Sequence, residues 1–280
     1  MRGYLVVDVF TDTPLEGNPL AVFTDASGIP PERMQRIARE MNLSETVFVL
    51  PPEAGGDHRI RIFTPFSELP FAGHPTLGTA YVLGSDSDAD AVSLETGVGT
   101  VEVRLARAGG RITSGRMTQP IPTWEPYEHA SDVLAALGGV ASVLPVEAYR
   151  NGPEHVYVAL DSEEAVAGLR PDLGALARLL DVGVYCFAGS GRRWRARMFA
   201  PGGGIPEDPA TGSAAGPLAV HLARHGRIAL GDEIEIRQGV EMGRPSTLHA
   251  RAVGQGEWIE RVEVAGSAVV VARGELLSEA

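Results

Sequence analysis

The stretch EDPATGSAAGPLAVHL (residues 207–222) places two acidic residues and a turn of small residues directly before an apolar run. A second stretch, FAGHPTLGTAYVL (residues 71–83), has the same order of features, with a glycine turn followed by small and apolar residues at helical spacing. Each stretch predicts a tight turn that opens a helix. Together they indicate that one structural unit occurs twice in the chain.

The segments before these two stretches match as well. Each turn follows an alternating strand pattern that ends in a variant of one pentapeptide, RIFTP at residues 61–65 and RMFAP at residues 197–201. Further upstream, a helical pattern at residues 30–41 has a counterpart at residues 170–180, and an apolar strand follows each. The order strand, helix, strand, strand, turn and helix therefore appears twice, which predicts two similar halves.

The boundary between the halves is expected near the proline-rich segment QPIP at residues 119–122. The last strand pattern, around residues 268–272, is expected to return to the first half. The predicted domains are therefore residues 1–120 together with 266–280, and residues 121–265.

The charge and hydropathy of the chain exclude two classes of partner. The net charge is −12, whereas a nucleic-acid-binding protein needs clustered basic residues that neutralise phosphates, so we expect no nucleic-acid partner. No apolar run approaches the roughly 20 residues that a membrane-spanning helix needs. The N-terminal residues also lack a signal-peptide pattern, so the sequence predicts a soluble cytoplasmic protein with no membrane partner.

Two scarce residue types restrict the chemistry. The chain has no lysine, which excludes a Schiff-base lysine and the phosphate-binding lysine of a P-loop. Its one cysteine, Cys186, lies in the apolar run VGVYCF and is expected in the core. A disulfide within the chain, a cysteine-based zinc site and a two-thiol mechanism are therefore excluded, and we expect no metal site.

The two glycine turns are candidate anion-binding sites. A helix N-terminus exposes backbone N–H groups and a partial positive charge, and both favour a carboxylate. The alternative is that the glycines only allow close packing. Three polar side chains within the turns favour function, since His74 can donate to an anion or move a proton, and Asp208 precedes Ser213 by five residues. The structural alternatives are a histidine in the core and an aspartate that caps the helix or stiffens a turn.

Glu45, in the segment NLSET, is a third candidate, although a glutamate at the start of a strand commonly points to solvent. The second half has no equivalent, because DVGVYCF follows the matching helix there. An epimerase that moves a proton between the two faces of a carbon needs two opposed bases. A carboxylate in only one half therefore favours a mechanism with a single proton carrier.

Five motifs occur in an order that resembles the PhzF family, the phenazine-biosynthesis proteins of the diaminopimelate epimerase-like superfamily. The motifs cover essentially the whole chain: VDVFTDTPLEGNPLAVF, NLSETVFV, FTPFSELPFAGHPTLGTA, EDPATGSAAGPLAVHL and QGVEMGRPS. The resemblance implies an α+β fold of two similar domains related by a pseudo-two-fold axis. Each domain would be a curved sheet wrapped around a central helix, and the active site would lie in the cleft between the domains.

The resemblance also implies the residue roles. Glu45, His74 and Asp208 would be catalytic, while Asn18, Gly73, Gly212 and Ser213 would bind the substrate. The phenazine enzyme moves a proton between two ring carbons of a dihydro-hydroxyanthranilate while the double bonds shift, without a cofactor. In the superfamily's epimerases each turn carries a catalytic cysteine, which is absent here.

The resemblance therefore predicts a cofactor-independent isomerase that acts on a small carboxylic acid and forms a homodimer. Two alternatives stay open at this point. One is an epimerase or racemase that uses non-cysteine bases, and the other is a non-catalytic protein that binds a small acid.

Overall fold

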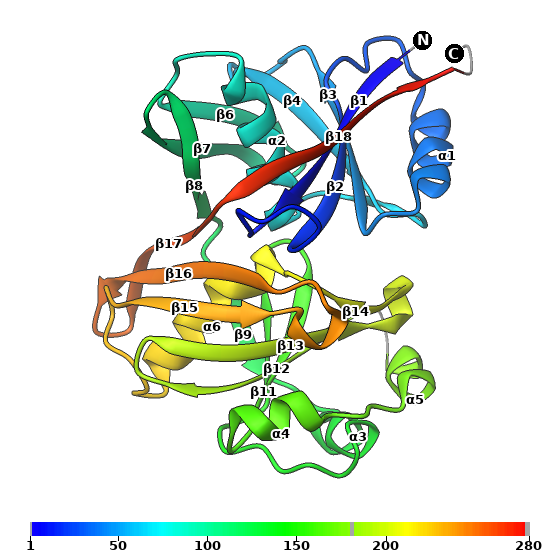
Figure 1. The fold of residues 1–280 in the computed structure, drawn as a ribbon. Helices are drawn as coiled ribbons and strands as arrows, with labels where there is room; N and C mark the ends of the chain where they lie inside the picture. Colours follow the sequence, from blue (N-terminus) through cyan, green and yellow to red (C-terminus); the bar gives the residue numbers. More distant parts are fainter. Residues whose placement is uncertain (1, 180–181, 278–280) are drawn as a thin grey trace. The chain divides into compact units, whose positions relative to one another are not determined.

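The chain folds into two compact units in the computed structural model, which describes residues 2–179 and 182–277 (Figure 1). The N-terminal unit comprises Met1–Thr118 together with the C-terminal segment Ala265–Ala280, and the C-terminal unit comprises Gln119–Val264. Among the described residues, no helix combines the length and the hydropathy needed to cross a membrane.

The N-terminal unit is built on a mixed sheet in the strand order β18, β1, β2, β3, β4, β6, β7 and β8. The C-terminal strand β18 pairs antiparallel with β1, from Arg2 opposite Leu276 to Val9 opposite Ala268. The pairs β2–β3 and β4–β6 are parallel. The strands are β1 (Arg2–Val9), β2 (Asn18–Phe23), β3 (Glu45–Leu50), β4 (His58–Phe63), β5 (Glu68–Leu69), β6 (Ala91–Thr96), β7 (Gly99–Ala108), β8 (Arg111–Gln119) and β18 (Ala268–Leu276).

Helix α2 (Gly73–Ser85) is the central helix of this unit. It packs against strands from both ends of the sheet order, and its residues from Gly73 to Ala80 are all buried (Figure 1). A helix that is apolar all round must be enclosed in this way. Gly78 permits the close approach, because a Cβ there would lie 2.6 Å from Val9 Cγ2 and 2.9 Å from Leu20 Cδ2.

Helix α1 (Pro31–Met41) has one apolar face and covers an aromatic cluster. Met34, Ile37 and Ala38 are its buried residues, as the helical spacing predicts. They pack on Phe23 and Phe48, whose rings stack with centroids 5.1 Å apart.

The C-terminal unit repeats this plan. Its sheet has the order β9, β10, β11, β12, β13, β15 and β16, and the central helix α6 packs mainly on β16. The strands are β9 (Thr123–Pro126), β10 (Glu147–Arg150), β11 (Glu154–Ala159), β12 (Gly183–Ser190), β13 (Arg193–Ala200), β14 (Ile205–Asp208), β15 (Glu233–Gln238), β16 (Ser246–Gln255) and β17 (Trp258–Gly266). The helices are α3 (Ala130–Ala136), α4 (Glu163–Gly168), α5 (Leu173–Arg178) and α6 (Gly212–Arg224), with short 3₁₀ turns η1 (Pro201–Gly203) and η2 (Val240–Met242).

The predicted α+β fold with two similar halves is confirmed, and the departures are local. The helix predicted at residues 170–180 is only α5, because Asp172 caps it at Leu173 with a bond to Ala175 N of 2.9 Å. Two residues at this point of the chain lie outside the described ranges. They are Leu180, the last residue of that helical pattern, and Asp181, the first residue of DVGVYCF. The continuous strand pattern VEVAGSAVVVA is two strands that break at Ser267, whose carbonyl accepts Phe10 N–H at 2.8 Å.

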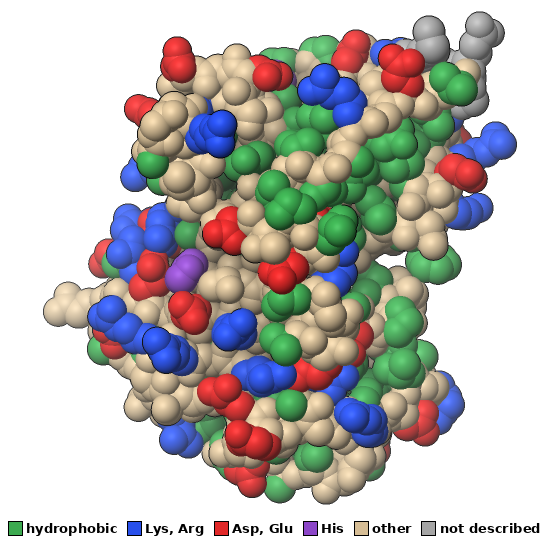
Figure 2. All heavy atoms as spheres, in the orientation of Figure 1, with side chains coloured by type: hydrophobic (Ala, Val, Ile, Leu, Met, Phe, Trp, Pro, Cys, Tyr) green, Lys and Arg blue, Asp and Glu red, His purple; other side chains and the backbone are tan. Residues whose placement is uncertain are grey.

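The face of the molecule in Figure 2 shows acidic and basic side chains interspersed over the C-terminal unit. Charges of both signs meet on neighbouring strands, since Arg193 on β13 lies opposite Glu235 on β15. Alternating signs of this kind are typical of a solvated sheet surface.

Candidate active site

The first group of polar residues in the N-terminal unit forms where three elements begin. Asn18 is the first residue of β2, Glu45 the first of β3, and His74 the second of α2. β2 and β3 are parallel, with Leu20 opposite Glu45, so both strands begin at the same edge of the sheet. All three side chains are buried.

His74 links the other two side chains. Its Nε2 lies 3.2 Å from Glu45 Oε2, and its Nδ1 lies 3.3 Å from Asn18 Nδ2. Burial lowers the pKa of His74 to about 3, so the imidazole is neutral near pH 7. With the amide nitrogen of Asn18 as donor to Nδ1, the single imidazole proton lies on Nε2, which is close to the Glu45 carboxylate but makes no hydrogen bond among the described residues. The arrangement can therefore orient a carboxylate without adding a full positive charge.

A second group surrounds Asp208 in the C-terminal unit. The Thr211 hydroxyl donates to Asp208 Oδ2 at 2.6 Å. Gln238 supports this pair, because its Nε2 donates to the Asp208 carbonyl at 2.8 Å and to Thr211 Oγ1 at 2.9 Å. Tyr185 Oη donates in turn to Gln238 Oε1 at 3.1 Å, which fixes the orientation of the amide. The Asp208 carboxylate is thus held by a chain of buried side chains from β12 and β15.

The third group lies at the first turn of α6. Gln119, Asn151 and Tyr157 donate to three successive carbonyls. The bonds are Gln119 Nε2 to Gly212 O at 2.9 Å, Asn151 Nδ2 to Ser213 O at 3.1 Å and Tyr157 Oη to Ala214 O at 2.7 Å. The side chain of Ser213 contacts a strand as well, with His155 Nε2 3.0 Å from Ser213 Oγ.

The turn of α6 needs an external donor because of its own sequence. In an α-helix the carbonyl of Ser213 would accept from the N–H of residue 217, which is a proline and has none. Asn151 supplies that missing donor. The first turn of the helix is therefore held in place by tertiary contacts.

Both central helices begin without a capping side chain at their N-termini. Thr211 occupies the cap position of α6, but its hydroxyl donates to Asp208 rather than accepting from the helix. Uncapped amides at the starts of two buried helices, at Gly73 and Gly212, are suited to the oxygens of an anion.

One group of potential metal ligands occurs in the part of the chain that the structure describes, namely Glu147, His221 and His225. Glu147 Oε2 lies 3.2 Å from His221 Nδ1 and 3.1 Å from His225 Nε2. The same oxygen also accepts from Arg224 Nη1 at 2.7 Å, so a guanidinium already balances the carboxylate. His221 Nε2 is buried without a hydrogen-bond partner, whereas a metal-bound histidine ordinarily donates its other N–H. These contacts describe a structural ion pair rather than a metal site.

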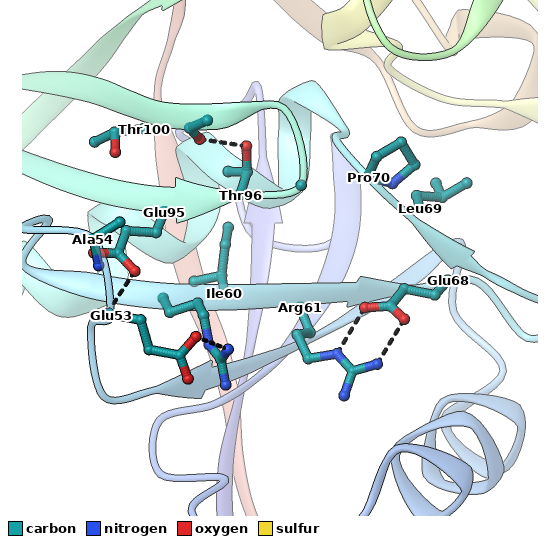
Figure 3. Close-up of a pocket in the computed structure, with 13 residues that line it drawn as sticks. Glu53, Ala54, Ile60, Arg61, Glu68, Leu69, Pro70, Glu95, Thr96 and Thr100 are labelled. Atoms are coloured by element: carbon teal, nitrogen blue, oxygen red, sulfur yellow. Dashed lines mark hydrogen bonds and ion pairs between the residues drawn. The ribbon is translucent and has the colours of Figure 1, made fainter.

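A groove of about 600 Å³ in the N-terminal unit lies along β4 (Figure 3). Its charged side chains pair with one another, since Arg61 binds Glu68 through two bonds of 2.7 and 2.6 Å, and Arg59 binds Glu53. Glu95 accepts from the backbone N–H groups of Glu53, Ala54 and Gly56. Because none of Asn18, Glu45 and His74 lines the groove, it is separate from the candidate site.

The structure joins predicted residues to others that the sequence did not single out. It places Glu45, His74 and Asn18 in contact, and it connects Asp208 to Thr211 and Ser213 to His155. Thr211 and Gln238 lay inside quoted motifs, so their positions could have been read from them. His155 and Tyr157 had only a weak signal, as polar groups in the otherwise apolar strand β11, and Asn151 lies in a loop and had no such signal. The catalytic and binding roles remain predictions.

The family model for phenazine biosynthesis-like proteins matches residues 7–274. The trans-2,3-dihydro-3-hydroxyanthranilate isomerase of Pseudomonas aeruginosa is 56% identical over 274 residues, which cover 98% of this chain and 99% of the relative. A predicted epimerase from Pseudomonas aeruginosa has a solved structure with a TM-score of 0.84 at 32% identity, covering 100% of each chain. The PhzF-family phenazine biosynthesis protein of Bacillus anthracis has a TM-score of 0.82 at 26% identity, covering 99% of each chain. The chain belongs to the PhzF family of phenazine biosynthesis-like isomerases.

Proposed function

We propose that this isomerase converts trans-2,3-dihydro-3-hydroxyanthranilate, the substrate named for its relative at 56% identity, and that Glu45 carries the proton. The observation that carries the proposal is the buried Glu45 carboxylate, 3.2 Å from a histidine that is neutral near pH 7. A carboxylate in such a place can accept a proton from carbon and keep it away from solvent.

The proposed reaction has two proton transfers. The Glu45 carboxylate removes a proton from one ring carbon, and the electron pair of the broken C–H bond shifts the double bonds of the ring. The protonated Glu45 then returns the proton to a second ring carbon, so that the carboxylate is regenerated. No electrons are gained or lost, which agrees with a reaction that needs no cofactor.

His74 and Asp208 act on the charge that develops during the transfer. The Nε2–H of His74 lies near Glu45 and would donate to its carboxylate, or to charge that develops on the substrate, once the substrate is bound. Asp208, fixed by Thr211 at 2.6 Å, would accept from a donor group on the substrate, which carries an amine and a hydroxyl. Asn18 would fix the imidazole tautomer.

Ser213 and the backbone amides at Gly73 and Gly212 would bind the substrate carboxylate. The first turn of α6 is held by three side-chain donors, so its amides are fixed before the ligand arrives. Groups that are ordered in advance bind an anion at a lower entropic cost.

An epimerase that uses Glu45 and His74 as opposed bases is disfavoured by their geometry. The two groups contact each other at 3.2 Å, whereas opposed bases must reach two faces of one carbon. The lowered pKa of His74, which results from burial, also makes it a weak base.

The homodimer and the cytoplasmic location are retained as predictions. Both rest on the family resemblance and on the sequence pattern, and size-exclusion chromatography with light scattering would test the first.

The proposed function is tested with Glu45→Gln, which keeps the size of the side chain and removes its ability to take a proton. Incubation with trans-2,3-dihydro-3-hydroxyanthranilate in D₂O, followed by absorbance and mass spectrometry, should show conversion by the native protein and a loss of about 10³-fold or more for the variant. The matched control is Glu40→Gln on the exposed face of α1, which should keep full activity. Conversion by Glu45→Gln at the native rate would rule out Glu45 as the carrier.

A further inference from the structure

His155 is a buried histidine that the proposed reaction does not yet use. It lies on β11, where a parallel partner strand places Gly183 opposite it. Its Nε2 is 3.0 Å from Ser213 Oγ, and both side chains are more than nine-tenths buried. The histidine therefore controls one hydrogen-bonding position of the Ser213 hydroxyl.

The other nitrogen of His155 has no hydrogen-bond partner among the described residues. It faces the backbone of Gly183 and the end of Met198, since a Cβ on Gly183 would lie 2.7 Å from His155 Nδ1 and 2.6 Å from Met198 Cε. Burial also lowers the pKa of His155 to about 4, so the ring carries one proton near pH 7.

The position of that one proton follows from its surroundings. Either tautomer leaves Nδ1 without a conventional partner and allows a hydrogen bond between Nε2 and Ser213 Oγ. Nδ1, however, faces the Cα–H of Gly183, which suits the lone pair of a bare nitrogen and opposes an N–H. The Nε2–H tautomer is therefore the stable one, and His155 donates to Ser213.

The hydroxyl of Ser213 has a single proton of its own. Because Oγ accepts from His155, this proton cannot be directed at the imidazole. Oγ makes no other side-chain hydrogen bond among the described residues. We infer that His155 is a positioning residue that makes Ser213 an obligatory donor, and that Ser213 directs its hydroxyl proton to the carboxylate oxygen of the substrate.

The opposite tautomer would have the opposite effect. If Ser213 donated to Nε2, its lone pairs would face the substrate and repel an anion. The His155 imidazole thus holds the Ser213 side chain in place. It also makes Ser213 favour a carboxylate over a neutral group in the substrate. The inference rests on the proposed function in that Ser213 binds the substrate carboxylate.

The test separates binding from turnover by using two stable aromatic probes in titration calorimetry. These are 3-hydroxyanthranilate, which has the carboxylate, and 2-amino-3-hydroxybenzamide, which has a neutral amide in its place. His155→Phe should weaken binding of the carboxylate by about tenfold to a hundredfold, the loss expected for one hydrogen bond to a charged group, and should leave binding of the amide within about twofold. His155→Gln, whose amide nitrogen can replace Nε2–H, should restore most of the affinity.

A double-mutant comparison shows whether His155 acts through Ser213. In the Ser213→Ala background, His155→Phe should cause no further loss of carboxylate affinity. Equal loss for both probes, additive losses of the two substitutions, or native affinity in His155→Phe would each overturn the inference. Glu45→Gln should abolish turnover without weakening either probe, so failure of the proposed function is distinguishable from failure at His155.

Discussion

At the scale of single residues, each unit contains a candidate group with a buried histidine whose protonation is set by its surroundings. His74 and His155 are both neutral near pH 7 because burial lowers their pKa values to about 3 and about 4. Each has one ring nitrogen close to a residue with a proposed role, 3.2 Å from Glu45 Oε2 for His74 and 3.0 Å from Ser213 Oγ for His155. Neutral donors stabilise an anion without the large desolvation cost of a buried cation.

Thr211 gives a residue-scale prediction for the Asp208 group. Thr211→Val keeps the shape of the side chain but removes the hydroxyl that binds Asp208 Oδ2 at 2.6 Å, and it leaves Gln238 Nε2 with one acceptor fewer. We expect kcat/KM to fall about tenfold to a hundredfold, because an unoriented carboxylate positions the substrate poorly. Thr211→Ser keeps the hydroxyl and should stay within about threefold of the native kcat/KM. An unchanged kcat/KM in Thr211→Val would show that Asp208 needs no such support.

At the scale of elements, the start of α6 is the feature on which the binding groups depend. Pro217 removes the internal donor for Ser213 O, and Asn151 replaces it from a loop between β10 and β11. Gly216 allows the Gln119 side chain to lie close to the helix, since a Cβ there would lie 2.3 Å from Gln119 Oε1. The helix start is therefore fixed by contacts that are distant in sequence.

The relation between Asn151 and Pro217 can be measured by a double-mutant cycle. Asn151→Ala should lower the free energy of unfolding by about 1–3 kcal/mol, because a buried carbonyl loses its donor. In a Pro217→Ala background the restored N–H of residue 217 can serve Ser213 O, so the same substitution should cost less than half as much. Urea unfolding followed by circular dichroism gives both values. Equal costs in the two backgrounds would contradict this account of the turn.

At the scale of the whole molecule, the same buried histidines couple stability to pH. Their folded-state pKa values are lower than the ordinary value of about 6.5, so the unfolded chain binds more protons than the folded one below that pH. For these histidines, the free energy of unfolding is therefore highest above about pH 6.5, and it decreases as the pH falls below that value. Glu147 adds to this at lower pH: burial alone would raise its pKa, but hydrogen bonds from His221, Arg224 and His225 hold the pKa well below the usual range.

The pH dependence gives a prediction for stability. Between pH 7 and pH 5, His74 and His155 should each remove on the order of 2 kcal/mol from the free energy of unfolding. Chemical denaturation at the two pH values measures the sum of these losses together with that of His221, whose pKa is also lowered by burial. His155→Phe should reduce the loss by about the share of one histidine. A free energy of unfolding that is equal at pH 7 and pH 5 would contradict the buried neutral state.

The sequence by itself determined the repeated unit, the starts of both central helices and the residues Glu45, His74, Asp208 and Ser213 as candidates. These features depend on local rules, because strand alternation, helical spacing and glycine turns act over a few neighbouring residues. Only the tertiary structure decided which side chains support them. His155, Asn151 and Gln238 reach the start of α6 from separate strands and loops, and the groups around each ring nitrogen set the tautomers. Such contacts join residues far apart in the chain, so no local pattern encodes them.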